Sequence, residues 1–348
     1  MLTLIYFVIM LGIIVFVHEL GHFLWAKKSG VYCYEFSIGF GPKIFSFKRK
    51  NDETTYSIRA FPVGGYVSMA GEEVDDDKSV PKSKKMYNKP WYKKLVIVLS
   101  GVTHNFILGF VVLLLMALIY GAVPTKPVLG VVDKASPSYK AGIRVGDEIT
   151  KINGKKVRTW DDVVLTLTLS NNKKHQKFTI IDKYNNEKII SVKPKEIKDK
   201  KGNKSYSYGI GLTDKKEHGF INSIKYASSK FISLFKSMIV TIKALVTGKI
   251  GINSLSGPVG IYSIVGEQSK TGLYGLMYLL AYLSINVGFI NLLPFPAFDG
   301  YRAVIIIIET ITGKKVNPKV DAIVNNIGLF LLFGLMIFIT IKDILKLF

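Results

Sequence analysis

The stretch that decides the fold is FVHELGHF, residues 16–23, which places His18, Glu19 and His22 inside an apolar run over residues 2–26. That run is long enough to cross a bilayer as a helix. An ionisable side chain near the bilayer centre costs about 2.5–3.5 kcal/mol on insertion scales. Three such side chains in one span therefore need a compensating role, such as metal ligation or a water-filled cavity.

The spacing of these three residues is that of a zinc site. Residues i and i+4 of a helix share a face, so His18 and His22 can bind one zinc ion through their imidazoles. Glu19 then lies about 100° further round the helix, beside a metal-bound water, where it can act as a general base. A histidine pair that served only packing would carry the same insertion cost without compensation.

The composition is that of an integral membrane protein with polar parts. The chain has 348 residues, 49% of them hydrophobic, a mean hydropathy of +0.28 and a formal charge of +22. Four apolar runs predict about four transmembrane helices: 2–26, about 95–121, about 272–293 and about 320–345. The first run has no basic region before it and contains the HExxH motif, so we do not expect a removable signal peptide.

The basic residues of the loops predict the orientation. The loop that follows the first span carries Lys27, Lys28, Lys43, Lys48, Arg49, Lys50 and a lysine cluster at 82–94. By the positive-inside rule this loop is expected in the cytoplasm, with the N-terminus and the long segment 122–270 outside. His18 precedes Lys27 by nine residues, which places it roughly 13 Å inside the cytoplasmic boundary of a hydrocarbon core about 30 Å thick.

The excess of lysine does not predict a nucleic-acid partner. The lysines are spread over loops beside the spans, no nucleic-acid recognition module is present, and attraction to anionic membrane lipid explains the charge. Cys33 is the only cysteine, which excludes an intramolecular disulfide and a cysteine-based metal site.

A third zinc ligand is expected near the third apolar run, which is followed by NLLPFPAFDG at residues 291–300. Pro294 and Pro296 break the helix, so Asp299 is expected in irregular backbone between apolar stretches. Irregular backbone at membrane depth is tolerated only where it is buried in protein or lines a water-filled cavity. Asp299 is therefore the candidate carboxylate ligand, and a cytoplasmic Asp-Gly turn is the alternative.

Together, HELGH at 18–22 and NLLPFPAFDG at 291–300 resemble the site-2 protease family of intramembrane zinc metalloproteases. The likeness continues through GFGP at 39–42, FPVGGYV at 61–67 and SGPVG at 256–260, and is greatest to bacterial members with a single PDZ domain. The resemblance implies that His18, His22 and Asp299 bind Zn²⁺, that Glu19 activates water, and that Asn291 holds an unwound substrate segment. Pro294, Gly64 and Gly65 join Asn291 as candidate substrate-binding residues.

Two departures from the family pattern concern residues near this site. GVTHNF at 101–106 is similar to the family's Gly-Pro-x-x-Asn-Phe stretch but lacks the proline, and Asp299-Gly300 is followed by Tyr301 where a second glycine is usual. Neither departure removes a ligand. His104 could alter the electrostatics of the metal site, but an interhelical hydrogen bond is the favoured interpretation.

Residues 122–215 change composition towards Lys, Asn, Asp and short β-branched runs, which indicates an inserted α+β domain. The motifs LGVVD at 129–133, AGI at 141–143, GDEI at 146–149 and ING at 152–154 resemble a PDZ domain. PDZ domains bind extended peptides at a sheet edge. The resemblance implies either peptide capture or a size filter, and a structural plug is a third possibility.

Two further segments have periodic patterns. Between Phe36 and Met69, partial alternation about a turn at 48–52 predicts strands that could pair with substrate backbone. Gly64 and Gly65 suit a tight turn or a close approach there. Residues 220–246 have helical spacing and predict either an interfacial amphipathic helix or a helix that covers the inserted domain.

The predicted architecture is a polytopic α-helical membrane protein with a cytoplasmic β-structured loop and an inserted extracytoplasmic PDZ-like α+β domain. Its parts are transmembrane helix 1 with HExxH (1–27), the membrane-associated β loop (28–94), transmembrane helix 2 (95–121), the PDZ-like domain (122–215), an amphipathic helix and linker (216–270), transmembrane helix 3 with the Asn-Pro-Pro-Asp motif and a short helix (271–319), and transmembrane helix 4 (320–348).

The predicted function is intramembrane zinc endoproteolysis in the bacterial plasma membrane, with the active site near its cytoplasmic side. Expected substrates are single-pass membrane proteins, such as anti-sigma-factor-like proteins, or remnant signal peptides. A proteolytically inactive, PDZ-bearing chaperone is the alternative, and Glu19 argues against it. A cation transporter is a third interpretation, but it lacks the inverted repeats expected of such folds.

Overall fold

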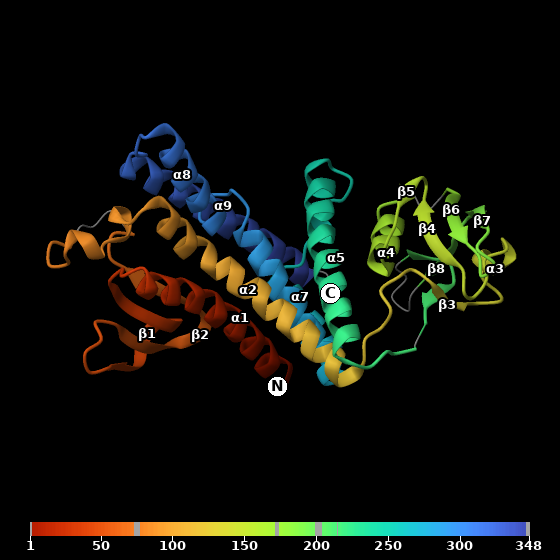
Figure 1. Cartoon of the computed structure of the whole chain (residues 1–348), viewed down its shortest axis with the longest axis horizontal. Helices are drawn as coiled ribbons and strands as arrows, with labels where there is room; N and C mark the ends of the chain where they lie inside the picture. The colour runs from red at the N-terminus through yellow and green to blue at the C-terminus, as the bar shows by residue number, and fades with distance from the viewer. Residues whose placement is uncertain (1, 73–76, 171–173, 199–203, 214, 346–348) are drawn as a thin grey trace. The chain divides into compact units, whose positions relative to one another are not determined.

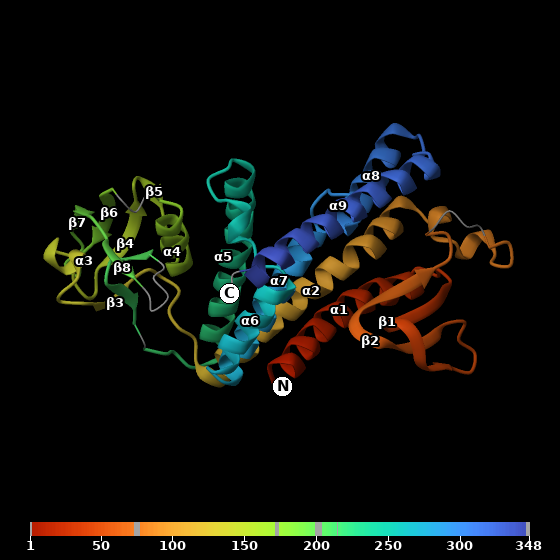
Figure 2. The same cartoon turned by 180° about the vertical axis from the view of Figure 1, so that it is seen from behind.

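The structure is a computed structural model that describes residues 2–72, 77–170, 174–198, 204–213 and 215–345. The chain forms two compact units (Figures 1 and 2). One comprises Met1–Val112 with Asn253–Phe348, and the other comprises Leu113–Ile252.

Four helices of the described chain are long and apolar enough to cross a membrane, as the sequence predicts. They are α1 (Leu2–Lys28), α2 (Trp91–Tyr120), α7 (Leu273–Asn291) and α9 (Pro318–Leu345). Only 11% of the most apolar window of α9 is buried by protein, so this helix leaves most of its surface for lipid.

Small residues let α1 and α2 pack closely. A Cβ atom added at Gly21 of α1 would lie 2.6 Å from the backbone oxygen of Ser100 on α2. Membrane helices gain stability from such close backbone approach, because lipid tails provide no hydrophobic drive for helix association. Gly21 is part of the HExxH motif, so the same five residues supply both the ligands and the helix contact.

The predicted strands are β1 (Cys33–Lys48) and β2 (Thr55–Met69), which pair in more than one register. The first part of β1 pairs with both the start and the end of β2, and its last part pairs with the start of β2. This sheet is called the hairpin below. In both ribbon views it lies beside α1. Phe36 of β1 packs on Phe23 of α1 with ring centroids 5.1 Å apart, and Tyr56 of β2 contacts Phe23 at 5.8 Å. The apolar face of the hairpin therefore belongs to the core of the first unit, which places the strands next to the HExxH helix.

The short helices after β2 and the C-terminal third complete the first unit. Two 3-10 turns, Lys82–Lys84 and Met86–Asn88, precede α2, and a third spans Ile252–Ser254. The sequence prediction treats residues up to 270 as linker, but α6 occupies Pro258–Ser269. A short helix, α8 (Asp299–Thr312), follows the proline-containing segment.

The second unit contains the inserted α+β domain. Its sheet has the strand order β5-β4-β6-β7, all antiparallel, and two further strand pairs are β10–β3 and β8–β9. The bounds are β3 (Leu129–Val132), α3 (Pro137–Lys140), β4 (Glu148–Ile152), β5 (Lys155–Lys156), α4 (Trp160–Thr168), β6 (Gln176–Ile181), β7 (Glu187–Val192), β8 (Lys195–Lys198), β9 (Lys204–Ser207) and β10 (Ile210–Leu212). Ile149, Phe178 and Ile180 are at the centre of its core.

The amphipathic segment is helix α5 (Phe220–Val246), and one side of it packs on the inserted domain. Lys230 of α5 forms an ion pair of 2.7 Å with Asp161 of α4, and the hydroxyls of Ser233 and Thr159 lie 3.1 Å apart. A different face carries exposed apolar side chains, Ile221, Ile232, Ile239 and Val246. One face of α5 therefore covers the domain. The exposed apolar face is compatible with the predicted position at a membrane interface, which stays a prediction.

Candidate active site

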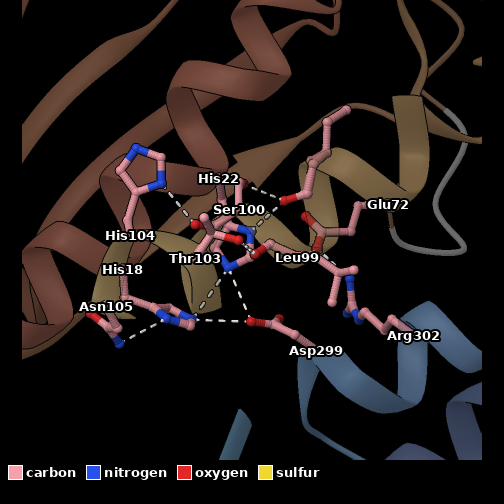
Figure 3. A network of polar contacts seen from close by, with 11 residues as sticks. His18, His22, Glu72, Leu99, Ser100, Thr103, His104, Asn105, Asp299 and Arg302 are labelled. Atoms are coloured by element: carbon pink, nitrogen blue, oxygen red, sulfur yellow. Dashed lines mark hydrogen bonds and ion pairs between the residues drawn. The ribbon is translucent and has the colours of Figure 1, made fainter. Parts of the chain in front are cut away.

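The two motif histidines point to one position from the same face of α1 (Figure 3). Their Nε2 atoms lie 3.2 Å apart, and both side chains are buried. The Oδ2 atom of Asp299 lies 3.2 Å from Nε2 of His18 and 3.4 Å from Nε2 of His22. The predicted third ligand thus meets the other two, although it is more than 270 positions away in the sequence.

Asp299 does not lie in irregular backbone, as the sequence analysis predicts, but is the first residue of α8. The irregular stretch is shorter and includes Ala297, an alanine with φ +80°. A carboxylate in the first turn of a helix is stabilised by the amide dipoles. Gly300 permits the sharp entry into α8, because an added Cβ would lie 2.2 Å from the backbone oxygen of Leu292.

The three ligand atoms fit a zinc ion. Zinc ligands at about 2.0–2.1 Å in tetrahedral geometry lie about 3.3–3.4 Å from one another. The observed separations of 3.2, 3.2 and 3.4 Å match that spacing. Oδ2 of Asp299 is buried without a conventional hydrogen bond, as is expected of an atom whose partner is a metal. Three protein ligands would leave a fourth position for water or substrate, as in catalytic zinc sites.

Helix α2 supports the ligands from behind, a role that the sequence analysis does not predict. Nδ1 of His22 lies 2.9 Å from the backbone oxygen of Ile97, and the side-chain amide of Asn105 lies 3.2 Å from Nδ1 of His18. Gly101 leaves the space the rings need, since an added Cβ would lie 2.3 Å from Nε2 of His22. The signal available in the sequence is the small and polar residues at 100, 101 and 105 of an apolar span.

A cavity of about 470 Å³ opens beside the three ligands. Glu19 lines it together with the histidines and Asp299. Gly65 of β2 lies against Glu19, because an added Cβ would be 3.4 Å from Cγ of Glu19 and 2.7 Å from the backbone oxygen of Ser37. The candidate base is therefore next to both the ligand cluster and the hairpin.

The structure brings three of the four candidate substrate-binding residues to this cavity. Gly64, Gly65 and Asn291 line it. Gly64 has φ +99°, and an added Cβ would overlap the ring of Phe40, so glycine is required there. Pro294 is exposed and lies outside the residues that line the cavity.

His104 does not form the interhelical hydrogen bond that the sequence analysis favours. Its Nδ1 atom is 2.8 Å from the backbone oxygen of Ser100, one turn earlier in the same helix. This local acceptor is available because backbone oxygens at i−4 lie within reach of a helical side chain. The ring lies near Gly21 of α1, which has no side chain to offer a partner.

Charged groups at the rim of the site are paired. Arg302, one turn after Asp299 on α8, forms an ion pair with Glu72, which follows β2 (Figure 3). Within the hairpin, Glu35 is contacted by Ser57, Arg59 and Lys43. Burial opposes ionisation of Glu35, but the hydrogen bonds from these groups and Tyr66 outweigh it and lower the pKa of Glu35 to about 2.

Comparison with known proteins agrees with this geometry. The model of peptidase family M50 matches residues 6–335, so the chain belongs to that family, the site-2 proteases. It is 33% identical to the regulator of sigma-W protease RasP of Bacillus subtilis, with 99% of each chain covered.

Other relatives carry similar names. A putative zinc metalloprotease of Clostridium acetobutylicum is 36% identical, with 96% of this chain and 94% of the relative covered. A putative zinc metalloprotease of Fusobacterium nucleatum is 35% identical over the full length of both chains. The chain is therefore a zinc metalloprotease of the site-2 type, and its four apolar helices make it an integral membrane protein.

Proposed function

We propose that the chain cleaves single-pass membrane proteins, or remnant signal peptides, within or near their transmembrane segments. One observation carries this proposal. His18, His22 and Asp299 come together beside Glu19, and both histidines and Glu19 belong to α1, a helix able to cross a membrane. A hydrolytic site on a membrane-spanning helix acts on peptide bonds inside the membrane, which soluble proteases do not reach.

His18, His22 and Asp299 would hold the zinc ion, which when bound supplies Lewis-acid activation of the scissile carbonyl and of water. Glu19 accepts a proton from the attacking water and delivers it to the leaving amine. Its place in the cavity, one residue from a ligand and against Gly65, fits both transfers. The burial of both histidines strengthens the electrostatic interactions of the reacting groups.

The hairpin is proposed to present the substrate. A transmembrane helix must unwind before a protease can cut it, and its freed backbone groups then need partners. The strand containing Gly64 and Gly65 lines the cavity and brings backbone amides and carbonyls to its wall. Asn291 and Pro294 are also proposed to bind substrate. Asn291 lines the same cavity and supplies an amide, whereas Pro294 is exposed outside its lining.

The basic loop over residues 27–94 supports a cytoplasmic location for the hairpin and an extracytoplasmic location for the N-terminus and the inserted domain. The inserted domain is proposed to be PDZ-like and to select substrates, by peptide binding or by size. RasP is named as a regulator of sigma-W, which supports an anti-sigma-factor-like protein as one substrate class.

The test is to co-express a tagged single-pass substrate with the wild type or with Glu19→Gln, and to map product ends by mass spectrometry. We expect a cut inside the transmembrane segment that Glu19→Gln abolishes while zinc content stays near normal. His18→Ala, His22→Ala and Asp299→Ala should each lose zinc as well. Intact substrate in both strains, for substrates with and without their outer domains, would favour a peptide-binding chaperone instead.

A further inference from the structure

A second cavity adjoins the catalytic cavity in the first unit. It measures about 1110 Å³ and lies among the start of α2, helix α8 and the start of α9. Glu72, Ala297 and Arg302 line both cavities, so they form the wall between them. The wall contains the Glu72–Arg302 ion pair, whose two side chains come from different elements.

The lining of the larger cavity contains charged side chains of both signs among apolar ones. Its charged residues are three acids and three bases: Glu72, Glu309, Asp321, Lys94, Arg302 and Lys315. Asn325 and Asn326 add amide groups. Charges of opposite sign in one lining cancel much of each other's electric field. The cavity therefore suits polar chains of mixed charge better than strongly acidic or basic ones.

The larger cavity lies at the helix ends that carry the basic residues predicted to face the cytoplasm. Lys94 lies near the start of α2 and Lys315 between α8 and α9, at the same ends of the helices as Lys27 and Lys28. Polar residues that flank a transmembrane segment are costly in hydrocarbon and need a polar environment as soon as the segment is drawn to the zinc ligands. An extended chain in the smaller cavity advances about 3.3 Å per residue, so a few residues suffice to pass the shared wall.

We propose that the larger cavity binds the polar residues that flank the transmembrane segment of the substrate on its cytoplasmic side, and that this chain passes the Glu72–Arg302 pair. This proposal rests on the proposed function. It makes the flanking sequence, in addition to the transmembrane segment itself, a determinant of which proteins are cut.

Disulfide cross-linking tests the proposal, because Cys33 is buried and is the only native cysteine. Ala322→Cys places a thiol in the larger cavity, and Ile323→Cys is the control on the adjacent residue, which is exposed and outside the lining. Each is combined with Glu19→Gln and with substrates that carry one cysteine on either flank of the transmembrane segment.

Ala322→Cys should cross-link to the cytoplasmic flank at least several-fold more than to the other flank, and Ile323→Cys should not distinguish them. Equal cross-linking at both flanks, or none, overturns the proposal when the wild type still cuts the same substrate. Failure of the wild type to cut any substrate overturns the proposed function, and this inference with it.

A separate observation concerns the side chain of Asn105. The residue is fully buried, and its backbone oxygen accepts a hydrogen bond of 2.8 Å from Ser284 of α7. With Nδ2 directed at Nδ1 of His18, the Oδ1 atom is buried without a hydrogen-bond partner among the described residues. A half-turn of the amide exchanges the two atoms without moving the rest of the residue.

The direction of His18 decides between the two amide orientations. Its Nε2 faces Asp299 and His22, so Nε2 is the atom directed at the metal position. A neutral imidazole that ligates through Nε2 carries its proton on Nδ1 and needs an acceptor there. We infer that Oδ1 of Asn105 accepts a hydrogen bond from Nδ1–H of His18, which makes Asn105 a positioning residue that fixes the tautomer and the ring orientation of His18.

Zinc affinity measured by chelator competition tests the inference without relying on activity. Asn105→Leu keeps the size but removes the acceptor and should weaken zinc binding about 10–100-fold. Asn105→Asp keeps an acceptor in either protonation state and should stay within a few-fold of the wild type. Ser284→Ala, which removes the hydrogen bond to the backbone of Asn105, should leave the affinity unchanged.

An Asn105→Asp protein that loses as much affinity as Asn105→Leu would show that the amide donates rather than accepts. An unchanged affinity in Asn105→Leu, or an equal loss in Ser284→Ala, would also overturn the inference, the last because the effect would then be one of packing.

Discussion

Gly101 sets how closely α2 approaches the two motif histidines. It sits where any side chain would enter the space occupied by their ring atoms. A helix interior ordinarily prefers alanine to glycine by about 1 kcal/mol. The presence of glycine here therefore indicates that the contact with the rings outweighs helix propensity.

We expect Gly101→Ala to displace His22 and to lower zinc content strongly, with cleavage lost in proportion. Gly334→Ala is the matched control, because Gly334 lies in membrane helix α9 with open space around it. That change should leave zinc content intact. The metal content of the purified proteins, measured by mass spectrometry, decides the matter, and normal zinc in Gly101→Ala would contradict the assigned packing.

The candidate metal ligands could be predicted from sequence to different degrees. His18 and His22 share one helix, so their spacing alone brings them together. Asp299 required the further argument that proline-broken backbone at membrane depth lines a cavity, and its exact setting at a helix start was missed. The small and polar residues at 100, 101 and 105 mark a helix contact, but the particular roles of Asn105 and Gly101 could not be predicted. Those roles depend on the register of α2 against α1, which neither helix encodes by itself.

At the scale of elements, α6 depends on a side chain far away in the sequence. Oδ2 of Asp343 on α9 accepts hydrogen bonds of 2.7 Å from the backbone N–H of Gly257 and 3.0 Å from that of Gly260. The residue before α6 is a glycine, which provides no capping side chain. This explains why the sequence predicts a linker there, whereas the alternation in β1 and β2 is local and was predicted correctly.

Asp343→Ala should destabilise the protein by about 1–2 kcal/mol, since it removes an N-terminal cap from α6. Asp343→Asn retains an acceptor oxygen and should recover most of the loss. Thermal unfolding in detergent measures both changes. Equal unfolding temperatures for the wild type and Asp343→Ala would show that the cap contributes nothing to stability.

The hairpin should respond to acid through Glu35. Its pKa of about 2 lies below the usual value of 4.5, so the fold favours the ionised carboxylate. The resulting stabilisation is complete above the usual pKa and disappears as the pH falls towards 2. The difference in unfolding temperature between wild type and Glu35→Gln should therefore be largest near neutral pH and shrink below about pH 4. A difference that does not change with pH would count against the ionic contacts.

At the scale of the whole molecule, the proposed zinc site joins α1 to α8 across most of the chain. Chelation should abolish cleavage, and readdition of Zn²⁺ should restore it, since the ligand cluster is made by residues already packed together. The far-ultraviolet circular dichroism should change little, because α1, α2 and the hairpin also share an apolar core. A large loss of helix on chelation would mean that the metal holds the fold itself.

The number of spans followed from hydropathy, because each run is long and continuous. The cavities could not be predicted from the sequence. They are formed by side chains from segments separated by more than 200 residues, such as Glu72 and Arg302.

The distance in sequence between His22 and Asp299 has a consequence for biosynthesis. A nascent chain inserts α1 early, but Asp299 is made only after more than 270 further residues. Under the proposed ligand set, the histidines lack their carboxylate partner until then, and the nascent polypeptide cannot hydrolyse the membrane segments emerging beside it. The order of the proposed ligands along the chain thus delays proteolytic competence until the start of α8 has been synthesised.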